Sequence, residues 1–184
     1  MWINPIAIAA FVLTVVATLL VDLAMFLPYW WRVTSDRGTY INYGLWTKSQ
    51  CDEDGSCVLS VTYQIEGGKE FLFISKIFMT FAVVLTQVAL ILHIIYVPIR
   101  KVVVRSIAIY CLGAAGLFVL LAFTIFLGKH QLLVERSKEF VVGWSICPAV
   151  LGCVVSLVAS GLTALASIKK AKRHEDEERL AGVV

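Results

Sequence analysis

Charged residues are scarce in this chain, and their scarcity excludes most soluble proteins. Only 16% of its 184 residues are Asp, Glu, Lys or Arg, whereas 59% are hydrophobic and the mean hydropathy is +0.84. Most of the charges gather in four blocks that separate long, nearly uncharged runs. A helix needs ~20 apolar residues to cross the hydrocarbon of a bilayer. The composition therefore predicts an α-helical membrane protein embedded in the lipid bilayer.

Catalytic and metal-binding motifs are also missing. The chain has no H-E-x-x-H, no phosphate-binding loop, no G-x-S-x-G and no C-x-x-C. Its three histidines (His93, His130 and His174) are scattered, so no pair is placed to share a metal. The net charge of +3 is small and gives no reason to expect nucleic acid as a partner. We expect no enzyme, no catalytic or metal-ligating residue and no cofactor.

Four apolar runs are long enough to span a membrane. Asn4 and Pro5 suit the start of the first run, and Pro28 stops it. The N-terminus lacks the basic region and cleavage site of a signal peptide, so this run is expected to remain as a span. The single four-span domain is expected to have spans at 5–27, 71–97, 102–127 and 140–168, loops at 28–70 and 128–139, a turn at 98–101 and a tail at 169–184.

Four spans place both termini on one side of the membrane. The turn 98–101 and the KKAKR cluster of the tail are basic, and the positive-inside rule puts such segments in the cytoplasm. The loop 128–139 also carries basic residues, which weakens this argument. Cys51 and Cys57 decide between the orientations, because they are the only cysteines in a polar loop and can pair in an oxidising compartment. Both termini are therefore predicted to be cytoplasmic and both long loops extracellular.

The loop 28–70 has the patterning of a small sheet. Residues Thr39–Thr47 are rich in Tyr, Ile and Trp, and Val58–Ile65 largely alternates in the period of a half-buried strand. We expect a small antiparallel sheet with one face on the end of the bundle. A disulfide between Cys51 and Cys57 would close a tight acidic turn. The acids of that turn are Asp52, Glu53 and Asp54.

A few polar residues interrupt the predicted spans. They are mainly Asp22, Lys76, Gln87 and His93, which offer poor material for a transporter or pore. Asp22 lies near the outer end of its span, where we expect it to reach water or a donor from the loop.

The fourth span repeats small residues every four positions, which lets helices approach closely in lipid. These residues are Gly152, Ser156, Ser160 and Ala164. We expect this row to pack inside the bundle against the small residues 113–116 of the third span.

The ordered residues of the first loop resemble those of the claudins. Claudins share the order W, G-L-W, C, C with the wider superfamily of peripheral myelin proteins, epithelial membrane proteins and calcium-channel gamma subunits. This chain carries the order as Trp30 or Trp31, then Gly44, Leu45 and Trp46, then Cys51 and Cys57. Counting from Pro28 selects Trp30 as the family tryptophan, and counting back from R-V-T selects Trp31. The resemblance implies a left-handed four-helix bundle under a small antiparallel extracellular sheet, to which the second loop adds an edge.

The resemblance also implies a plasma-membrane protein that contacts other proteins through its extracellular loops. It would assemble with copies of itself in the same and in facing membranes, and act in cell adhesion, junction assembly or a paracellular barrier. In a paracellular path, Asp52, Glu53 and Asp54 would be the charge-setting residues. The alternative is an auxiliary, gamma-type subunit that modulates the trafficking or gating of an ion channel or receptor. Val184 at the C-terminus is a weak indication of capture by a PDZ-type domain.

Overall fold

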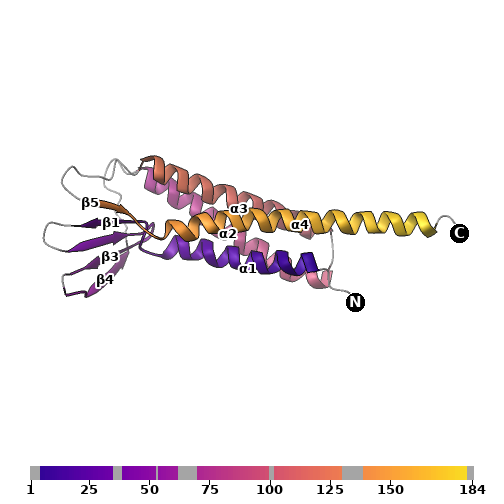
Figure 1. Ribbon diagram of the computed structural model, residues 1–184, viewed down its shortest axis with the longest axis horizontal. Helices are drawn as coiled ribbons and strands as arrows, with labels where there is room; N and C mark the ends of the chain where they lie inside the picture. Colours follow the sequence, from indigo (N-terminus) through magenta and orange to yellow (C-terminus); the bar gives the residue numbers. More distant parts are fainter. Residues whose placement is uncertain are drawn as a thin grey trace.

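Four long helices form a bundle that carries a small β-sheet at one end (Figure 1). The computed structural model describes residues 5–34, 39–52, 54–61, 70–99, 102–129 and 139–181. The helices are α1 (Pro5–Phe26), α2 (Glu70–Ile99), α3 (Val102–Lys129) and α4 (Ile146–Ala181). Helix α1 begins and α4 ends at the end opposite the sheet, where α4 extends beyond the other helices (Figure 1).

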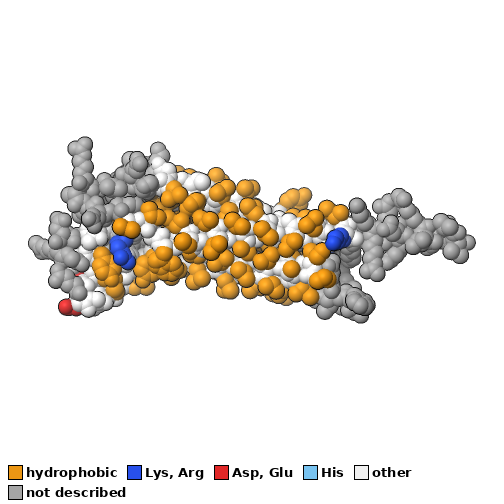
Figure 2. All heavy atoms as spheres, in the orientation of Figure 1, with side chains coloured by type: hydrophobic (Ala, Val, Ile, Leu, Met, Phe, Trp, Pro, Cys, Tyr) orange, Lys and Arg blue, Asp and Glu red, His pale blue; other side chains and the backbone are white. Residues whose placement is uncertain are grey.

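All four helices are long and apolar enough to cross a membrane. The candidate spans are Pro5–Phe26, Phe71–Ile95, Val102–Gly128 and Ile146–Lys169. Hydrophobic side chains cover the visible face of the bundle, and the Lys and Arg side chains on that face lie near its two ends (Figure 2). A bilayer requires such an apolar belt between polar ends. The structure therefore agrees with a four-helix membrane protein, while the left-handed sense of the bundle stays a prediction.

Helix α4 differs most from its predicted boundaries. Residues 139–142 form a strand, and α4 begins at Ile146, so the prediction that the fourth span starts at Phe140 is wrong. The cause is that a short apolar run does not distinguish a strand from the first turn of a helix. At its other end α4 continues past Ile168 to Ala181, because the charged segment is rich in strong helix formers.

Within the described residues, the sheet has five antiparallel strands in the order β4-β3-β2-β1-β5. They are β1 (Trp31–Thr34), β2 (Tyr40–Tyr43), β3 (Thr47–Cys51), β4 (Cys57–Val61) and β5 (Glu139–Val142). Strand β5 pairs with β1, so that Trp31 lies opposite Val142 and Thr34 opposite Glu139. It adds an edge to the sheet, as expected of a segment next to the second loop.

The two predicted strands of the first loop are only partly right. Thr39–Thr47 is not one strand, because β2 ends at Tyr43 and β3 begins at Thr47. The Gly44 N–H donates to the Thr47 carbonyl at 2.7 Å and closes the turn between them. Strand β4 covers the first part of the predicted Val58–Ile65, whose residues 62–65 lie outside the described residues.

The main core lies where the sheet meets the bundle. It combines large buried side chains from the helices and from the first loop: Val21, Trp30, Leu45, Met79, Val119 and Phe126. A second, smaller cluster of Ala89, Leu112 and Ala159 packs between the helices. The sheet is therefore seated on the helices by the largest core of the molecule.

Candidate functional site: a disulfide-closed cap on the bundle

The cap comprises the sheet together with residues 28–30, 44–46 and 143–145. Its first anchor is Trp30, whose side chain is fully buried and whose Nε1 donates to the Ala24 carbonyl at 2.6 Å. In a helix that carbonyl would accept from the residue four positions later. That residue is Pro28, which has no N–H. The Trp30 indole therefore supplies the donor that Pro28 lacks, and it ties the start of the cap to the end of α1.

Trp31 anchors the cap through ring contacts. Its ring stacks on Tyr43 of β2 with centroids 5.0 Å apart and planes 7° apart. Both tryptophans also contact Phe126 of α3, with centroid distances of 5.2 Å for Trp30 and 5.6 Å for Trp31. The role of Phe126 was not predicted from the sequence, because nothing distinguishes it from the other apolar residues of its span. Both tryptophans are buried, so burial does not show whether Trp30 or Trp31 is the first tryptophan of the W, G-L-W, C, C order.

The turn Gly44-Leu45-Trp46 lies on the end of α1. A Cβ at Gly44 would lie 2.6 Å from the Leu27 carbonyl oxygen and 2.8 Å from Pro28 Cα, so only glycine fits without a backbone shift. Leu45 enters the main core, whereas Trp46 is 37% exposed and its ring lies 5.3 Å from Lys76 Nζ. The turn thus places Leu45 in the main core and leaves Trp46 partly exposed at the surface.

A second close approach joins β5 and α4 to the start of the cap. The Gly143 N–H donates to the Trp30 carbonyl at 2.8 Å, and the Ser145 N–H donates to the Tyr29 carbonyl at 3.0 Å. Trp144 stacks on Tyr29 at 5.2 Å. A Cβ at Gly143 would overlap the Tyr29 carbonyl. These contacts hold residues 29–30 and 143–145 together, although more than 100 residues separate the two segments in the sequence.

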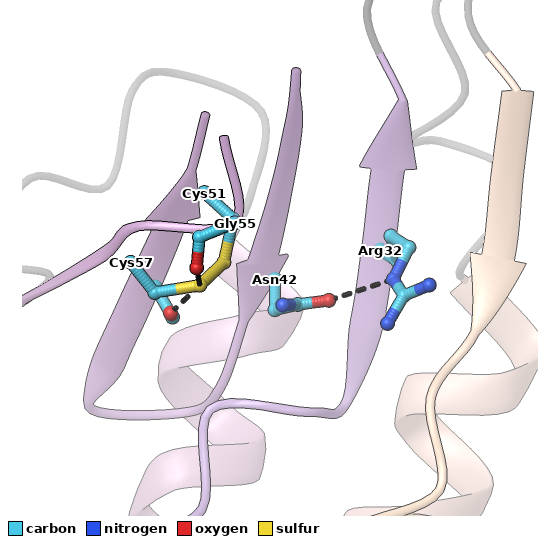
Figure 3. Close-up of a disulfide and its surroundings, with 6 residues drawn as sticks. Arg32, Asn42, Cys51, Gly55 and Cys57 are labelled. Atoms are coloured by element: carbon cyan, nitrogen blue, oxygen red, sulfur yellow. Dashed lines mark hydrogen bonds between the residues drawn. A yellow bond between two sulfur atoms is a disulfide. The ribbon is translucent and has the colours of Figure 1, made fainter. Parts of the chain in front are cut away.

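The predicted disulfide between Cys51 and Cys57 is present. It joins the facing ends of β3 and β4 (Figure 3). The intervening turn is closed by hydrogen bonds from the Asp52 N–H to the Ser56 carbonyl and from the Gly55 N–H to the Asp52 carbonyl, both 3.0 Å. Gly55 has a φ of +79°, which glycine adopts without the strain of a side chain. Asp52 and Asp54 are exposed, and Glu53 lies outside the described residues.

The middle strands of the sheet carry a polar row on one face. Residues directly opposite on antiparallel strands share a face, and Arg32, Asn42 and Ser49 form such a row across β1, β2 and β3. The Arg32 Nε donates to Asn42 Oδ1 at 2.8 Å (Figure 3). The Arg32 guanidinium also lies 4.7 Å from the centroid of the Tyr40 ring. These contacts with Asn42 and Tyr40 fix the position of the exposed Arg32 side chain on the sheet.

Both edge strands of the sheet expose apolar side chains. On β4, Val58 is 68% exposed, Leu59 64% and Val61 49%; on β5, Val141 and Val142 are also exposed. Successive residues of a strand point to opposite faces, so β4 is apolar on both faces, and no described residue pairs with its outer edge. Proteins usually protect a free edge with charge, proline or a covering segment. The edges are therefore the part of the cap best suited to contact another protein.

The row of small residues on α4 serves two helix interfaces. A Cβ at Gly152 would lie 3.0 Å from Val21 Cγ2 on α1, whereas the Ser160 hydroxyl donates to the Ile109 carbonyl on α3 at 2.9 Å. Positions four apart on a helix of 3.6 residues per turn rotate by about 40° at each step, so the row turns from α1 towards α3. Ser160 thus lies against Gly113 of α3, one of the expected partners, because a Cβ at Gly113 would lie 3.5 Å from the Ser160 hydroxyl, whereas Gly152 packs on α1. Ser156 is buried and Ala164 is half-buried.

The polar residues of the spans mostly pair with other helices. Gln87 Nε2 donates to Asp22 Oδ2 at 3.0 Å, so the partner of Asp22 is on α2 and the expectation of water or a loop donor is wrong. His93 lies 3.4 Å from the Thr163 hydroxyl, and its Nδ1 lies 2.9 Å from the Ala89 carbonyl oxygen. These contacts connect α1 with α2 and α2 with α4. Intramembrane polar residues commonly fasten helices in this way.

Within the described ranges, no three His, Cys, Asp or Glu side chains lie close enough together to hold a metal ion. Val184 lies outside the described residues.

The fold and composition define a multi-pass membrane protein with four apolar helices and a small antiparallel sheet. No protein-family model and no curated protein matches this chain.

Proposed function

We propose that the cap lies outside the cell and contacts other membrane proteins. The observation that carries this proposal is the pair of exposed apolar edges, on β4 and β5, of a sheet anchored at Trp30, Trp31 and Gly143. Anchoring limits the loss of conformational freedom on binding, because the contacting surface is already ordered. Apolar surface on such an ordered element is typical of an interaction site.

The disulfide supports the extracellular placement of the cap. Disulfides persist in oxidising compartments, and Cys51–Cys57 lies in the cap. Both chain termini would then be cytoplasmic, since α1 begins and α4 ends at the opposite end of the bundle (Figure 1). The basic residues of the tail agree with that side.

The resemblance to claudins supports a role at the plasma membrane. We infer that the protein acts in cell–cell contact, junction assembly or a paracellular barrier, with copies of itself in the same and in facing membranes as partners. Asp52 and Asp54 are exposed at the tip of the cap, where an ion passing between cells would meet their charges.

Expression in cells that do not normally adhere tests this function. The protein should concentrate in strand-like arrays at cell contacts. The variant Leu59→Lys should reach the surface but lose that concentration, because Leu59 is exposed and a charge on an edge strand opposes association. Gln50→Lys, on the interior strand β3, is the matched control and should behave like the wild type.

Three outcomes contradict the proposal or part of it. A uniform surface distribution of the wild type argues against cell–cell contact. If Leu59→Lys and Gln50→Lys lose their concentration at cell contacts to the same degree, the β4 edge is not the contact surface. Stoichiometric purification of a channel or receptor with the protein, without concentration at contacts, would instead support the auxiliary-subunit alternative.

A further inference from the structure

Helices α1 and α2 each bring one polar side chain to their shared interface. Gln87 Nε2 of α2 donates to Asp22 Oδ2 of α1 at 3.0 Å. Both residues lie within the candidate membrane spans of their helices. At 1.5 Å per residue, Gln87 lies about 24 Å along α2 from one end of its span and about 12 Å from the other. The contact therefore lies away from both ends of the α2 span, where side chains would meet water.

The second oxygen of the Asp22 carboxyl is buried without a hydrogen bond. Among the residues that the structure describes, no donor reaches Asp22 Oδ1. An ionised carboxyl only accepts hydrogen bonds, and both of its oxygens need donors. As a carboxylate, Asp22 would have one neutral amide N–H to stabilise a full negative charge inside the span. A buried charge with so few partners is costly, and a carboxyl in that position binds a proton instead.

The charged and titratable side chains around this contact do not supply a counter-ion. Besides Asp22, such residues in the four candidate spans are Lys76, His93, Arg105, Tyr110, Cys111, Cys147, Cys153 and Lys169. On α2, Lys76 lies about 16 Å along the helix from Gln87, and its side chain tilts further away, towards the helix N-terminus. His93, about 9 Å from Gln87 on the other side, contacts the Ala89 carbonyl and the Thr163 hydroxyl.

The cations of the other two helices are also distant from Asp22. On α4, Gly152 lies against Val21, the residue beside Asp22. Lys169 lies about 25 Å along α4 from Gly152. Arg105 is the fourth residue of α3, near the end of that helix. Within the described residues, the Gln87 amide is therefore the recorded polar partner of the Asp22 carboxyl.

We propose that Asp22 carries a proton in the folded protein at neutral pH, and that the neutral pair Asp22–Gln87 is a pH-sensitive latch between α1 and α2. The proton removes the charge, while Gln87 keeps its hydrogen bond to Oδ2. A neutral hydroxyl inside the span costs far less than a charge. Ionised Asp22 needs more donors than this interface supplies, so ionisation loosens α1 from α2. Helix α1 packs less extensively on α2 than on α4, so the latch lies at the weaker of these two interfaces.

The pH dependence of thermal stability tests the latch. The folded protein holds this proton more tightly than the unfolded chain, so the stabilisation is largest at low pH and is lost as the pH rises. Asp22→Asn keeps the size and the acceptor oxygen of the side chain but cannot ionise. From about pH 6 to about pH 8 in one detergent, the melting temperature of the wild type should fall at least about 4 °C further than that of Asp22→Asn. Asp54→Asn, which removes an exposed acid, is the matched control and should follow the wild type.

Infrared spectroscopy in a detergent without ester groups reports the proton itself. A protonated carboxyl has a C=O stretching band that a carboxylate lacks. At about pH 7 the wild type and Asp54→Asn should show this band, and Asp22→Asn should lack it. Labelling the aspartate carboxyl carbons with ¹³C should shift the band of the wild type, a measurement that holds even if Asp22→Asn fails to fold.

Two kinds of result overturn the proposal. Asp22 is not the protonated group if the wild type lacks the band at about pH 7, if ¹³C-labelled aspartate does not shift it, or if Asp22→Asn retains it. The latch is refuted if the melting temperatures of the wild type and Asp22→Asn depend equally on pH, because the folded protein then gains nothing from the proton on Asp22.

Discussion

Replacing each of the two adjacent tryptophans with phenylalanine separates hydrogen bonding from ring packing in the cap. Trp30→Phe removes the indole N–H that donates to the Ala24 carbonyl, whose helical donor is missing because of Pro28. In the described part of the chain the Trp31 indole donates no hydrogen bond. A phenyl ring at position 31 keeps the stacking on Tyr43. The two substitutions therefore remove similar volumes but differ by one buried hydrogen bond.

The structure gives an expected magnitude for each change. Leaving the buried Ala24 carbonyl without a donor costs about 1–3 kcal/mol. The volume lost on replacing an indole with a phenyl ring adds about 1 kcal/mol at either position. We therefore expect a loss of about 3 kcal/mol for Trp30→Phe and about 1 kcal/mol for Trp31→Phe. For a chain of this size the melting temperature should fall by about 6–12 °C and about 2–4 °C respectively.

Thermal unfolding of the purified variants in one detergent measures the difference. Each sample is heated in steps, and the fraction that remains monodisperse is followed by size-exclusion chromatography. Trp30→Phe should lose its monodisperse peak at the lower temperature. Equal shifts, or a larger shift for Trp31→Phe, would show that the Trp30 hydrogen bond does not stabilise the cap as argued.

Two further predictions concern the cap. Cys51→Ser and Cys57→Ser should each reduce surface delivery, measured by surface biotinylation, to a similar degree, because either change removes the same cross-link of about 2 kcal/mol; normal delivery of both variants would contradict a structural role for the disulfide. Gly143→Ala should lower the melting temperature by at least about 4 °C, because the new Cβ overlaps the Tyr29 carbonyl. Gly128→Ala meets nothing within 4 Å and is the control; equal effects of the two glycine variants would refute the close approach at Gly143.

The parts of the fold that were predictable rest on local chemistry. Uninterrupted apolar runs predicted four helices because crossing a bilayer sets a minimum length, and Pro28 marked the end of α1 because proline cannot continue the hydrogen bonding. The Cys51–Cys57 disulfide was predictable because no other cysteine lies in a polar loop.

Strands β1 and β5 were not predictable in the same way. Each is four residues long and lies beside a long apolar run, so neither shows a period of its own. Their pairing brings Trp31 opposite Val142, far apart in the chain. The four-residue spacing of Gly152 and Ser160 likewise did not reveal that one packs on α1 and the other on α3.

The sequence by itself determined the environment of each segment: which stretches belong in lipid, which loop can carry a disulfide, and where the first helix must stop. These properties follow from transfer free energies and from covalent structure, which act on each residue separately. Only the tertiary structure decided that Phe126 supports both tryptophans, that Gln87 is the partner of Asp22, and that Gly143 must lack a side chain. Those facts depend on the distance between residues that the chain order keeps apart, and no property of a single residue encodes that distance.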